Sequence, residues 1–165
     1  PGGGAIPATV GDMATTRLDR RFGLVYLAFN SITNLVSQAA QVACFRNAAD
    51  HLDPGGAFLI ETFVPPLQRL PVGETRLAFE HSETHWGIDA INTTTQAMVS
   101  HHLHLVDGAW EDFSVPARYV WPSELDLMAE IAGLAPESRW ANWRRDPFVA
   151  TSAGNVSVWR KPAAP

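Results

Sequence analysis

The chain has little of what would take it into a membrane or out of a reducing compartment. Cys44 is its single cysteine, so a disulfide framework is excluded and a cytoplasmic location fits. No apolar run is long enough to cross a bilayer, and the sequence opens with Pro-Gly-Gly-Gly instead of the basic-then-apolar order of a signal peptide. Cys44 falls on a helical pattern, which predicts a core thiol and not a nucleophile.

Charge is also scarce, and it is scattered along the chain. Charged residues make up 18% of the 165 residues, and the net charge is −5. A tight basic pair such as Arg144-Arg145, with Arg139 nearby, does not amount to a nucleic-acid footprint. Hydrophobic residues reach 46%, so residues 1–165 suit a single globular domain with a core of its own. We expect neither nucleic acid nor a membrane among its partners.

Several catalytic signatures are missing as well. The chain has no G-x-S-x-G elbow, which excludes a serine hydrolase of that type. It has no P-loop and no G-x-G-x-x-G, so the common phosphate-binding loops are excluded too. No pair of acids has the spacing expected of a carboxylate-based catalyst.

The first feature that the sequence does contain is a predicted strand followed by a helix and a second strand. Residues 24–29 (LVYLAF) are almost uniformly apolar, as in a strand buried on both faces, and a short strand end is expected at residues 8–10. A helix is predicted over residues 37–52, with Ser37 as its N-cap and an Asp-Pro-Gly-Gly turn at its end. Residues 57–63 form the next buried strand, which completes a crossover unit of an open α/β sheet. The apolar stripe of the helix consists of Val42, Phe45, Ala49 and Leu52.

The second half of the chain is mostly β-like. Residues 75–120 contain alternating runs, and Asp107-Gly108 between two of them is a hairpin signal. A helix then starts at Pro122 and ends at Gly133. The fold class is therefore α/β, a partial parallel sheet with an antiparallel β insert. The remaining expectations are an apolar helix stripe of Leu125, Met128, Ile131 and Ala132, closing strands at 139–143 and 155–159, and a linker at 1–7.

Two strand ends carry residues that suit a ligand site. Gly11, Asp12 and Met13 follow the first short run, where the carboxylate can accept a hydrogen bond from an adenine amino group and Met13 can cover a ring. The alternative is an ordinary turn, since Gly and Asp are common turn residues. Asn30 and Ser31 follow the buried strand and can hold the amino-acid end of a cofactor or a small acceptor. Their alternative role is to cap the next segment.

Histidines crowd the predicted insert. On a strand, His102 and His104 face the same side and His101 the other, and two imidazoles on one side can bind a metal when a third ligand joins them. The sequence shows no third ligand at a telling spacing, so we expect no metal. Half-exposed sheet histidines, or a single general base, fit the pattern better. The crowded set is His81, His85, His101, His102 and His104.

The order of these segments resembles a known family. VGDMATTRLDRRFGLVYLAFNSITNL, QAAQVACFRNAADHL, DPGGAFLIETFVP and YVWPSELDLMAEIAGL occur in this order. Together they resemble class I S-adenosylmethionine-dependent methyltransferases of the actinobacterial small-molecule type, with a Rossmann-like sheet. The resemblance implies S-adenosylmethionine as cofactor and a small-molecule acceptor. It implies adenine contacts for Gly11, Asp12 and Met13, and methionine or acceptor contacts for Ala28, Phe29, Asn30 and Ser31.

The resemblance also assigns a role to the insert at residues 75–120, which covers the acceptor pocket in that family. We expect one wall of this pocket to be formed by Trp86, His102 and Trp121. The candidates for a base that removes the acceptor's proton are His85, His102 and Tyr119. The alternative is a sheet that only buries tryptophans or pairs with a second copy of the chain as a homodimer.

One part of the family pattern is missing. The family's first strand, its Gly-rich acidic loop and the acid ending its second strand would precede everything printed here. Because those parts hold the methionyl group and the ribose, we expect this chain to be a C-terminal portion, and its start at Pro1 instead of Met agrees. We expect the chain alone to bind cofactor weakly or not at all. A non-catalytic binding or dimerisation module derived from the same fold is the alternative function.

Overall fold

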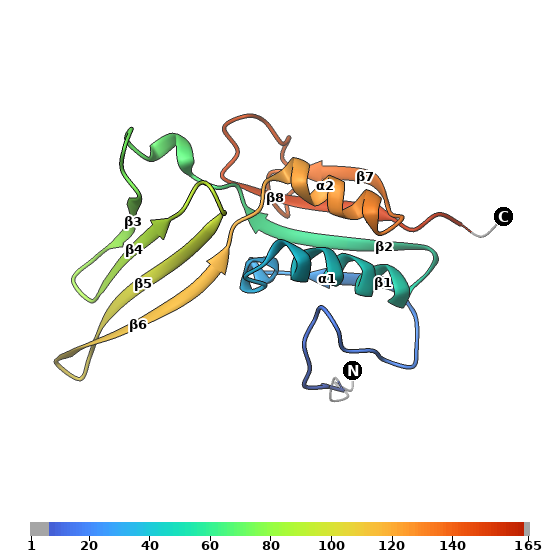
Figure 1. The fold of residues 1–165 in the computed structure, drawn as a ribbon, viewed down its shortest axis with the longest axis horizontal. Helices are drawn as coiled ribbons and strands as arrows, with labels where there is room; N and C mark the ends of the chain where they lie inside the picture. The colour runs from blue at the N-terminus through green and yellow to red at the C-terminus, as the bar shows by residue number, and fades with distance from the viewer. Residues whose placement is uncertain (1–6, 164–165) are drawn as a thin grey trace.

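The structure, a computed structural model, describes residues 7–163 and contains two four-stranded sheets (Figure 1). The predicted linker at 1–7 lies almost wholly outside the described residues. No helix in the described part of the chain is long and apolar enough to span a membrane. The elements are β1 (Phe22–Leu27), η1 (Ser31–Asn34), α1 (Gln38–His51), β2 (Leu52–Phe63), η2 (Leu67–Arg69), β3 (Arg76–His81), β4 (His85–Ile91), β5 (Ala97–Val106), β6 (Ala109–Arg118), α2 (Pro122–Ile131), β7 (Ala135–Trp140) and β8 (Gly154–Arg160).

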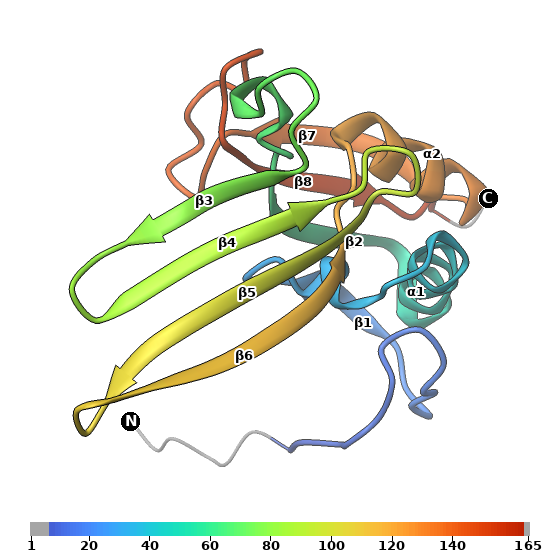
Figure 2. The same cartoon turned by 60° about the vertical axis from the view of Figure 1, so that its left-hand side comes forward.

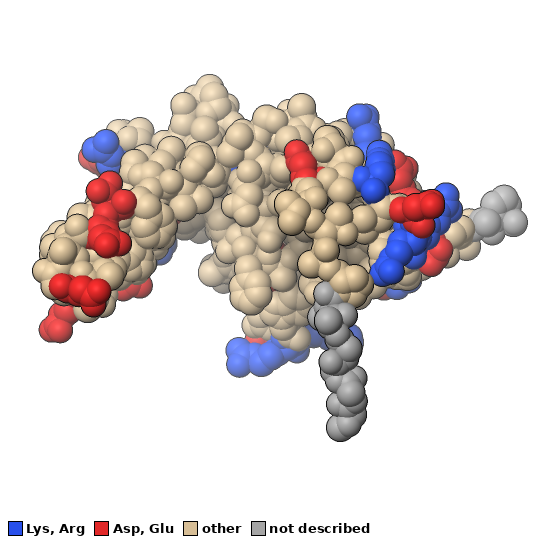
Figure 3. Space-filling view, turned by 90° about the horizontal axis from the view of Figure 1, so that it is seen from below, with Lys and Arg blue, Asp and Glu red and all other residues tan. Residues whose placement is uncertain are grey.

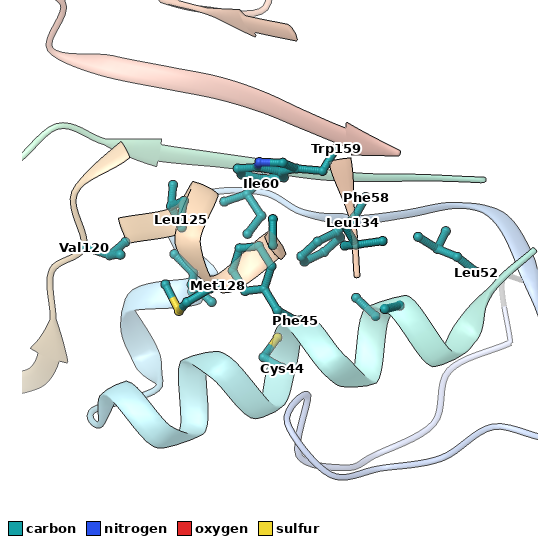
Figure 4. Close-up of a cluster of buried hydrophobic side chains, with 14 of the residues drawn as sticks. Cys44, Phe45, Leu52, Phe58, Ile60, Val120, Leu125, Met128, Leu134 and Trp159 are labelled. Atoms are coloured by element: carbon teal, nitrogen blue, oxygen red, sulfur yellow. The ribbon is translucent and has the colours of Figure 1, made fainter. Parts of the chain in front are cut away.

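Sheet A carries the α/β part of the fold. Its strand order is β1-β2-β8-β7, with β1 parallel to β2 and the other pairs antiparallel. Helices α1 and α2 cover one face of this sheet (Figures 1 and 4). The strand, helix and parallel strand predicted from the sequence are therefore present, and they place the ends of β1 and β2 side by side.

The core lies between the two helices and sheet A. Phe45 of α1 packs edge-on against Phe58 of β2 and Trp159 of β8, with ring centroids 5.1 and 5.4 Å apart (Figure 4). All three side chains are buried, and each contributes about 1.5–3 kcal/mol by leaving water. Figure 4 also shows Leu125 and Met128 of α2 pointing into the same cluster.

Helix α1 begins and ends close to where the sequence predicts. The Ser37 hydroxyl accepts a hydrogen bond from the Ala40 backbone N–H, which confirms the N-cap. The helix stops at His51, and Leu52 is already extended. Strand β2 therefore starts five residues earlier than expected, at Leu52 instead of Ala57. The Asp-Pro-Gly-Gly segment, which was predicted as a turn, belongs to this strand, and Gly55 within it has φ 78°.

Sheet B is the predicted β insert. Strands β3, β4, β5 and β6 form an antiparallel meander (Figure 2). The turn between β5 and β6 has Asp107 at φ 50° and Gly108 at φ 82°, and Val106 pairs with Ala109. Two consecutive residues with positive φ are what a two-residue type I′ hairpin requires, so the hairpin prediction is confirmed.

The second helix differs from its prediction in one residue of the buried stripe. Pro122 occupies the first turn and Gly133 follows the helix at φ 74°, as expected. Ile131, however, is 46% exposed, and Ala129 is fully buried in its place. Ala129 lies four residues after Leu125 and therefore on the same helical face, whereas Ile131 lies six residues after it.

Three strand predictions were wrong in part. Residues 8–10 form no strand, because nothing in the described chain pairs with them. Strand β1 is not buried on both faces: Leu24 is 52% and Tyr26 62% exposed, since among residues 7–163 β1 is an edge strand bonded only to β2. The strand expected at 139–143 lies earlier, as Ala135–Trp140, where it pairs with β8.

Candidate functional site

The turn that follows β1 is the most strained backbone in the α/β part of the fold. Phe29 and Asn30 have φ of 54° and 59°, a region that non-glycine residues seldom adopt. The Asn30 side-chain oxygen accepts a hydrogen bond from the Phe63 backbone N–H at 2.8 Å, and Glu61 accepts one from the Phe29 N–H at 2.7 Å. Two side chains thus tie the end of β1 to the end of β2, and such over-determined strain is typical of ligand sites.

The alternative role of Asn30 and Ser31, as caps of the next segment, agrees with the structure only in part. Asn30 precedes the short helix η1, but its side chain makes no capping bond there. The Ser31 hydroxyl donates to the Ala28 carbonyl at 2.6 Å and so closes the turn locally. The Phe29 ring is 89% exposed. The turn therefore exposes an aromatic ring to solvent, while the Asn30 side chain is hydrogen-bonded to the backbone of β2.

Residues 11–13 form a tight turn in the structure. The Asp12 carboxylate accepts a hydrogen bond from the Ala14 N–H at 2.7 Å, and its carbonyl accepts from Thr15 and Thr16. A side chain at Gly11 would collide with Thr16, because a Cβ would lie 2.2 Å from its hydroxyl oxygen. The turn alternative for Gly11 and Asp12 therefore has direct support, while the other carboxylate oxygen of Asp12 has no partner among the described residues.

Helix α1 holds this turn in place. Asn47 donates from its amide to the carbonyls of Met13 and Thr16, and His51 Nε2 accepts from the Leu18 N–H at 2.8 Å. Beneath the turn lies a cavity of about 300 Å³ that Asp12 and Met13 help to line. Burial, with a smaller effect of Asp12, raises the pKa of the Cys44 thiol to about 12, so this cavity-lining cysteine is a core thiol as predicted.

A larger cavity of about 560 Å³ lies where sheet A meets sheet B. Phe63, whose N–H is bonded to Asn30, belongs to its wall, so the cavity adjoins the strained turn. The side chains on its sheet B wall come from alternate positions of β3, β4 and β5. The lining residues are Phe63, Val64, Pro65, Pro66, Gln68, Arg69, Phe79, Asp89, Met98, Ser100, His102, Trp121, Ala150, Thr151, Ser152 and Ala153.

Three polar side chains in this wall, those of Asp89, Ser100 and His102, lie close enough to influence one another. The Ser100 hydroxyl donates to Asp89 at 2.6 Å, and burial raises the pKa of the Asp89 carboxyl above its ordinary value. Burial lowers the pKa of His102, and the neighbouring His85 and His104 lower it further. A lowered pKa favours the neutral form of the His102 ring, which is the form that can accept a proton.

Of the three residues predicted to form a wall of the acceptor pocket, two line this cavity and one does not. His102 and Trp121 line the cavity, but Trp86 does not. Register explains the error: His102 lies opposite Gly87, so Trp86 points to the other face of sheet B. There it is 47% exposed and donates its indole N–H to the Ser82 carbonyl.

The other two candidate bases lie away from the cavity wall. His85 Nε2 lies 3.0 Å from His102 Nδ1, so it contacts the cavity histidine without lining the cavity itself. Tyr119 is 1% exposed and packs with Ile91 and Met98, and burial raises its pKa. The catalytic assignment of all three remains a prediction.

Sequence reasoning missed Asp89, Ser100 and Glu61 as site residues. The alternation in HWGIDAIN places Asp89 on the same face as His85, which was a usable signal. Ser100 becomes meaningful only once the register of β4 against β5 pairs it with Asp89, and register is not readable from one strand. Glu61 lies near the end of a predicted strand, but its bond to Phe29 connects residues 32 positions apart.

Comparisons with known proteins agree with this architecture. No family model matches the chain. Cypemycin N-terminal methyltransferase from a Streptomyces species is 28% identical over 157 residues and covers 89% of this chain, which spans 61% of that protein. The solved CcbJ methyltransferase from Streptomyces caelestis has a TM-score of 0.80 at 36% identity, covering 93% of this chain and 62% of that one.

A more distant structure shares the fold alone. An S-adenosylmethionine-dependent methyltransferase from Clostridium acetobutylicum has a TM-score of 0.74 at 9% identity, covering 94% of this chain and 64% of that one. The chain thus spans less than two thirds of the length of each of these relatives. In sequence and in fold it is similar to methyltransferases from Streptomyces. Its α/β sheet with an added antiparallel sheet matches the Rossmann-like fold of an S-adenosylmethionine-dependent methyltransferase.

Proposed function

We propose that this chain is the C-terminal portion of an S-adenosylmethionine-dependent methyltransferase that acts on a small molecule. The observation that carries the proposal is the 560 Å³ cavity beside the strained turn after β1. Its volume lies within the range of small-molecule sites, and it combines apolar walls with a few convergent polar groups. Its place at the carboxyl end of a parallel strand pair is where open α/β sheets bind ligands.

The free edge of β1 supports the idea of a partial domain. Within the part of the chain that the structure describes, strand β1 pairs on one side only, and Leu24 and Tyr26 are more than half exposed. An apolar strand with a free edge is a template for further strands. We propose that a longer protein supplies those strands beside β1, together with the groups that hold the methionyl and ribose parts of the cofactor.

The residues present fit one side of a cofactor site. Asp12 has a free carboxylate oxygen beside the exposed turn, and the exposed Phe29 ring adjoins the end of β2. We assign cofactor contacts to Gly11, Asp12, Met13, Ala28, Phe29, Asn30 and Ser31. When bound, S-adenosylmethionine supplies an electrophilic methyl group. The chain's task is then to align the acceptor and exclude water.

His102 is the base that the cavity favours. Its Nδ1 is engaged with His85, which leaves Nε2 to take a proton from an acceptor amine or hydroxyl. Asp89 and Ser100 lie in the same wall and suit recognition of a polar or cationic acceptor group. The relative named for N-terminal methylation of cypemycin makes an amine a reasonable first acceptor to test.

Two finer assignments belong to the same proposal. We place the protein in the cytoplasm, because its one cysteine is a buried free thiol. We also propose homodimerisation through the outer face of sheet B, where large apolar side chains are exposed. These side chains are Trp86, Ile88, Leu103, Leu105 and Trp110.

Calorimetry and product assays test the proposal. S-adenosylhomocysteine should bind an upstream-extended chain, and should bind these 165 residues alone weakly or not at all. In the extended chain, formation of S-adenosylhomocysteine is measured with a panel of small amines and hydroxyl compounds. His102→Gln should lower the rate by about 10²–10⁴-fold, as for a lost general base, while His101→Gln, on the opposite face of β5, should leave it unchanged. An extended chain that binds no cofactor would favour the non-catalytic module.

A further inference from the structure

Three histidines converge on the inner face of sheet B. His85 of β4 lies directly opposite His104 of β5, and His102 is the next residue on the same face. One ring nitrogen from each histidine lies within 4.8 Å of the corresponding nitrogen of the other two. The closest approach joins His85 Nε2 and His102 Nδ1 at 3.0 Å.

Local packing holds the three rings together. A side chain at Gly87, opposite His102, would collide with the Phe79 ring, because a Cβ would lie 2.3 Å from its Cε2. Phe79 therefore closes over this glycine and packs against His102 at 5.2 Å. On the other side the Phe113 ring stacks on His102, with centroids 4.7 Å apart. The imidazoles are confined between two phenyl rings on one sheet face.

We propose that His85, His102 and His104 form a binding site for a divalent transition-metal ion of the zinc type. Imidazole nitrogen binds Zn²⁺ at about 2.0–2.1 Å, so two tetrahedral ligands lie roughly 3.3 Å apart. The His85–His102 separation already matches this span. The three imidazole rings lie nearly parallel, with 11–18° between their planes. Binding one ion therefore requires the rings to rotate about their terminal side-chain torsions, which are soft.

The surroundings suit a cation. Asp89 is buried on the same face of β4, two residues from Gly87, and Glu111 of β6 lies directly opposite His104. Figure 3 shows acidic side chains over the hairpin end of sheet B. Three histidines leave one tetrahedral position open for water or another ligand, and His102 lines the large cavity. The proposed ion site would therefore adjoin the cavity through His102.

This site revises the expectation of no metal. His102 and His104 lie on one side of a strand, but the third ligand comes from a neighbouring strand in a register that the sequence does not reveal. If the proposed methyl transfer also holds, a bound ion occupies a ring that otherwise accepts a proton. Added zinc is then expected to inhibit that reaction. The binding site itself does not depend on this reaction.

Zinc alone is the probe, with the 165-residue chain prepared without a polyhistidine tag. Titration calorimetry with Zn²⁺ should give one ion per chain, and Co²⁺ should give the visible absorption of a tetrahedral site. His104→Phe keeps an aromatic ring in the stack, so its thermal melting should be retained while zinc affinity falls at least about tenfold. His85→Asn should weaken binding to a similar extent.

His101→Ala is the matched control. His101 is on the same strand but on the opposite face, where it bonds to Ser114, so its loss should leave zinc affinity unchanged. The proposal is overturned if the chain binds no zinc, or if folded His104→Phe binds zinc as tightly as the unchanged chain. It is also overturned if His101→Ala weakens binding as much as His104→Phe. The three rings would then be an aromatic stack only.

Discussion

Arg118 Nη2 lies 2.7 Å from Glu124 Oε1, and this buried ion pair joins the end of β6 to the first turn of α2. The guanidinium also donates to Gln41 of α1 at 2.5 Å and to Gln96 at 2.9 Å. Each polar group of the pair has partners, as buried charges require. The network links sheet B to both helices on sheet A, and so it helps set the shape of the cavity between the two sheets.

Replacing Arg118 by Met should destabilise the protein by about 3 kcal/mol. Breaking a buried pair costs about 3–5 kcal/mol, because the remaining charge is left without compensation. The lower end applies here, since the Glu124 side chain is 12% exposed. Urea unfolding measures the change. The control is Arg144→Met, whose pair with Asp146 is mostly exposed at 3.6 Å and should cost less than about 1 kcal/mol. Equal losses in the two variants would contradict the prediction.

The same pair predicts acid sensitivity. Burial alone would raise the pKa of Glu124, but hydrogen bonds from Gln96, Arg118 and Gln38 outweigh it and hold the pKa below the ordinary value. A carboxyl with a depressed folded-state pKa adds stability above its unfolded value of about 4.3, and that stability is lost as pH falls through the folded value. Unfolding free energies measured from pH 7 to 3 should therefore fall, and Glu124→Gln should flatten the decline. A Gln variant with the same slope would assign the acid sensitivity to other groups.

Local signals in the sequence predicted the elements that local chemistry decides. Ser37 caps α1 because its hydroxyl needs only the N–H three residues on, and Asp107-Gly108 turns because both residues tolerate positive φ. The exposed edge of β1 was not predictable, because an apolar run does not reveal whether it has one neighbour or two. The prediction that Trp86 lines the pocket was wrong for a similar reason, since the sheet face on which Trp86 lies depends on the register of two strands.

The candidate site shows the same division. Asn30 and His102 were visible as polar residues after or within apolar runs. Their partners were not, because Phe63 and His85 meet them through contacts that span 33 and 17 residues. Ser100 entered the site only through its pairing with Asp89. What sequence reasoning could not supply was the pairing between strands, and that pairing decides which side chains meet.

Asn30 offers a direct test of the strained turn after β1. Asn30→Ala removes the acceptor for the Phe63 N–H and places a residue poorly suited to φ 59°. The expected loss is about 1–3 kcal/mol of unfolding free energy. Asn30→Gly keeps the backbone conformation but not the acceptor, while Asn30→Asp keeps both. Chemical denaturation should therefore rank stability as Asp above Gly above Ala. A Gly variant as stable as the unchanged chain would show that the Phe63 bond contributes nothing.

Substitutions of Asp12 can distinguish a role of its carboxylate in the turn from a role in cofactor binding. One carboxylate oxygen accepts from the Ala14 N–H, and the other is free to accept from an adenine amino group. Asp12→Asn keeps the first acceptor but replaces the second with a donor, which would face the donor of adenine. Asp12→Ala loses both.

In an upstream-extended chain, both variants should therefore bind S-adenosylhomocysteine more weakly by about 1–3 kcal/mol, and only the Ala variant should also lose stability. Calorimetry and urea unfolding on the same samples measure the two effects separately. If Asp12→Asn binds as tightly as the unchanged protein, the carboxylate serves the turn alone. The adenine side of the cofactor site must then be sought among other residues.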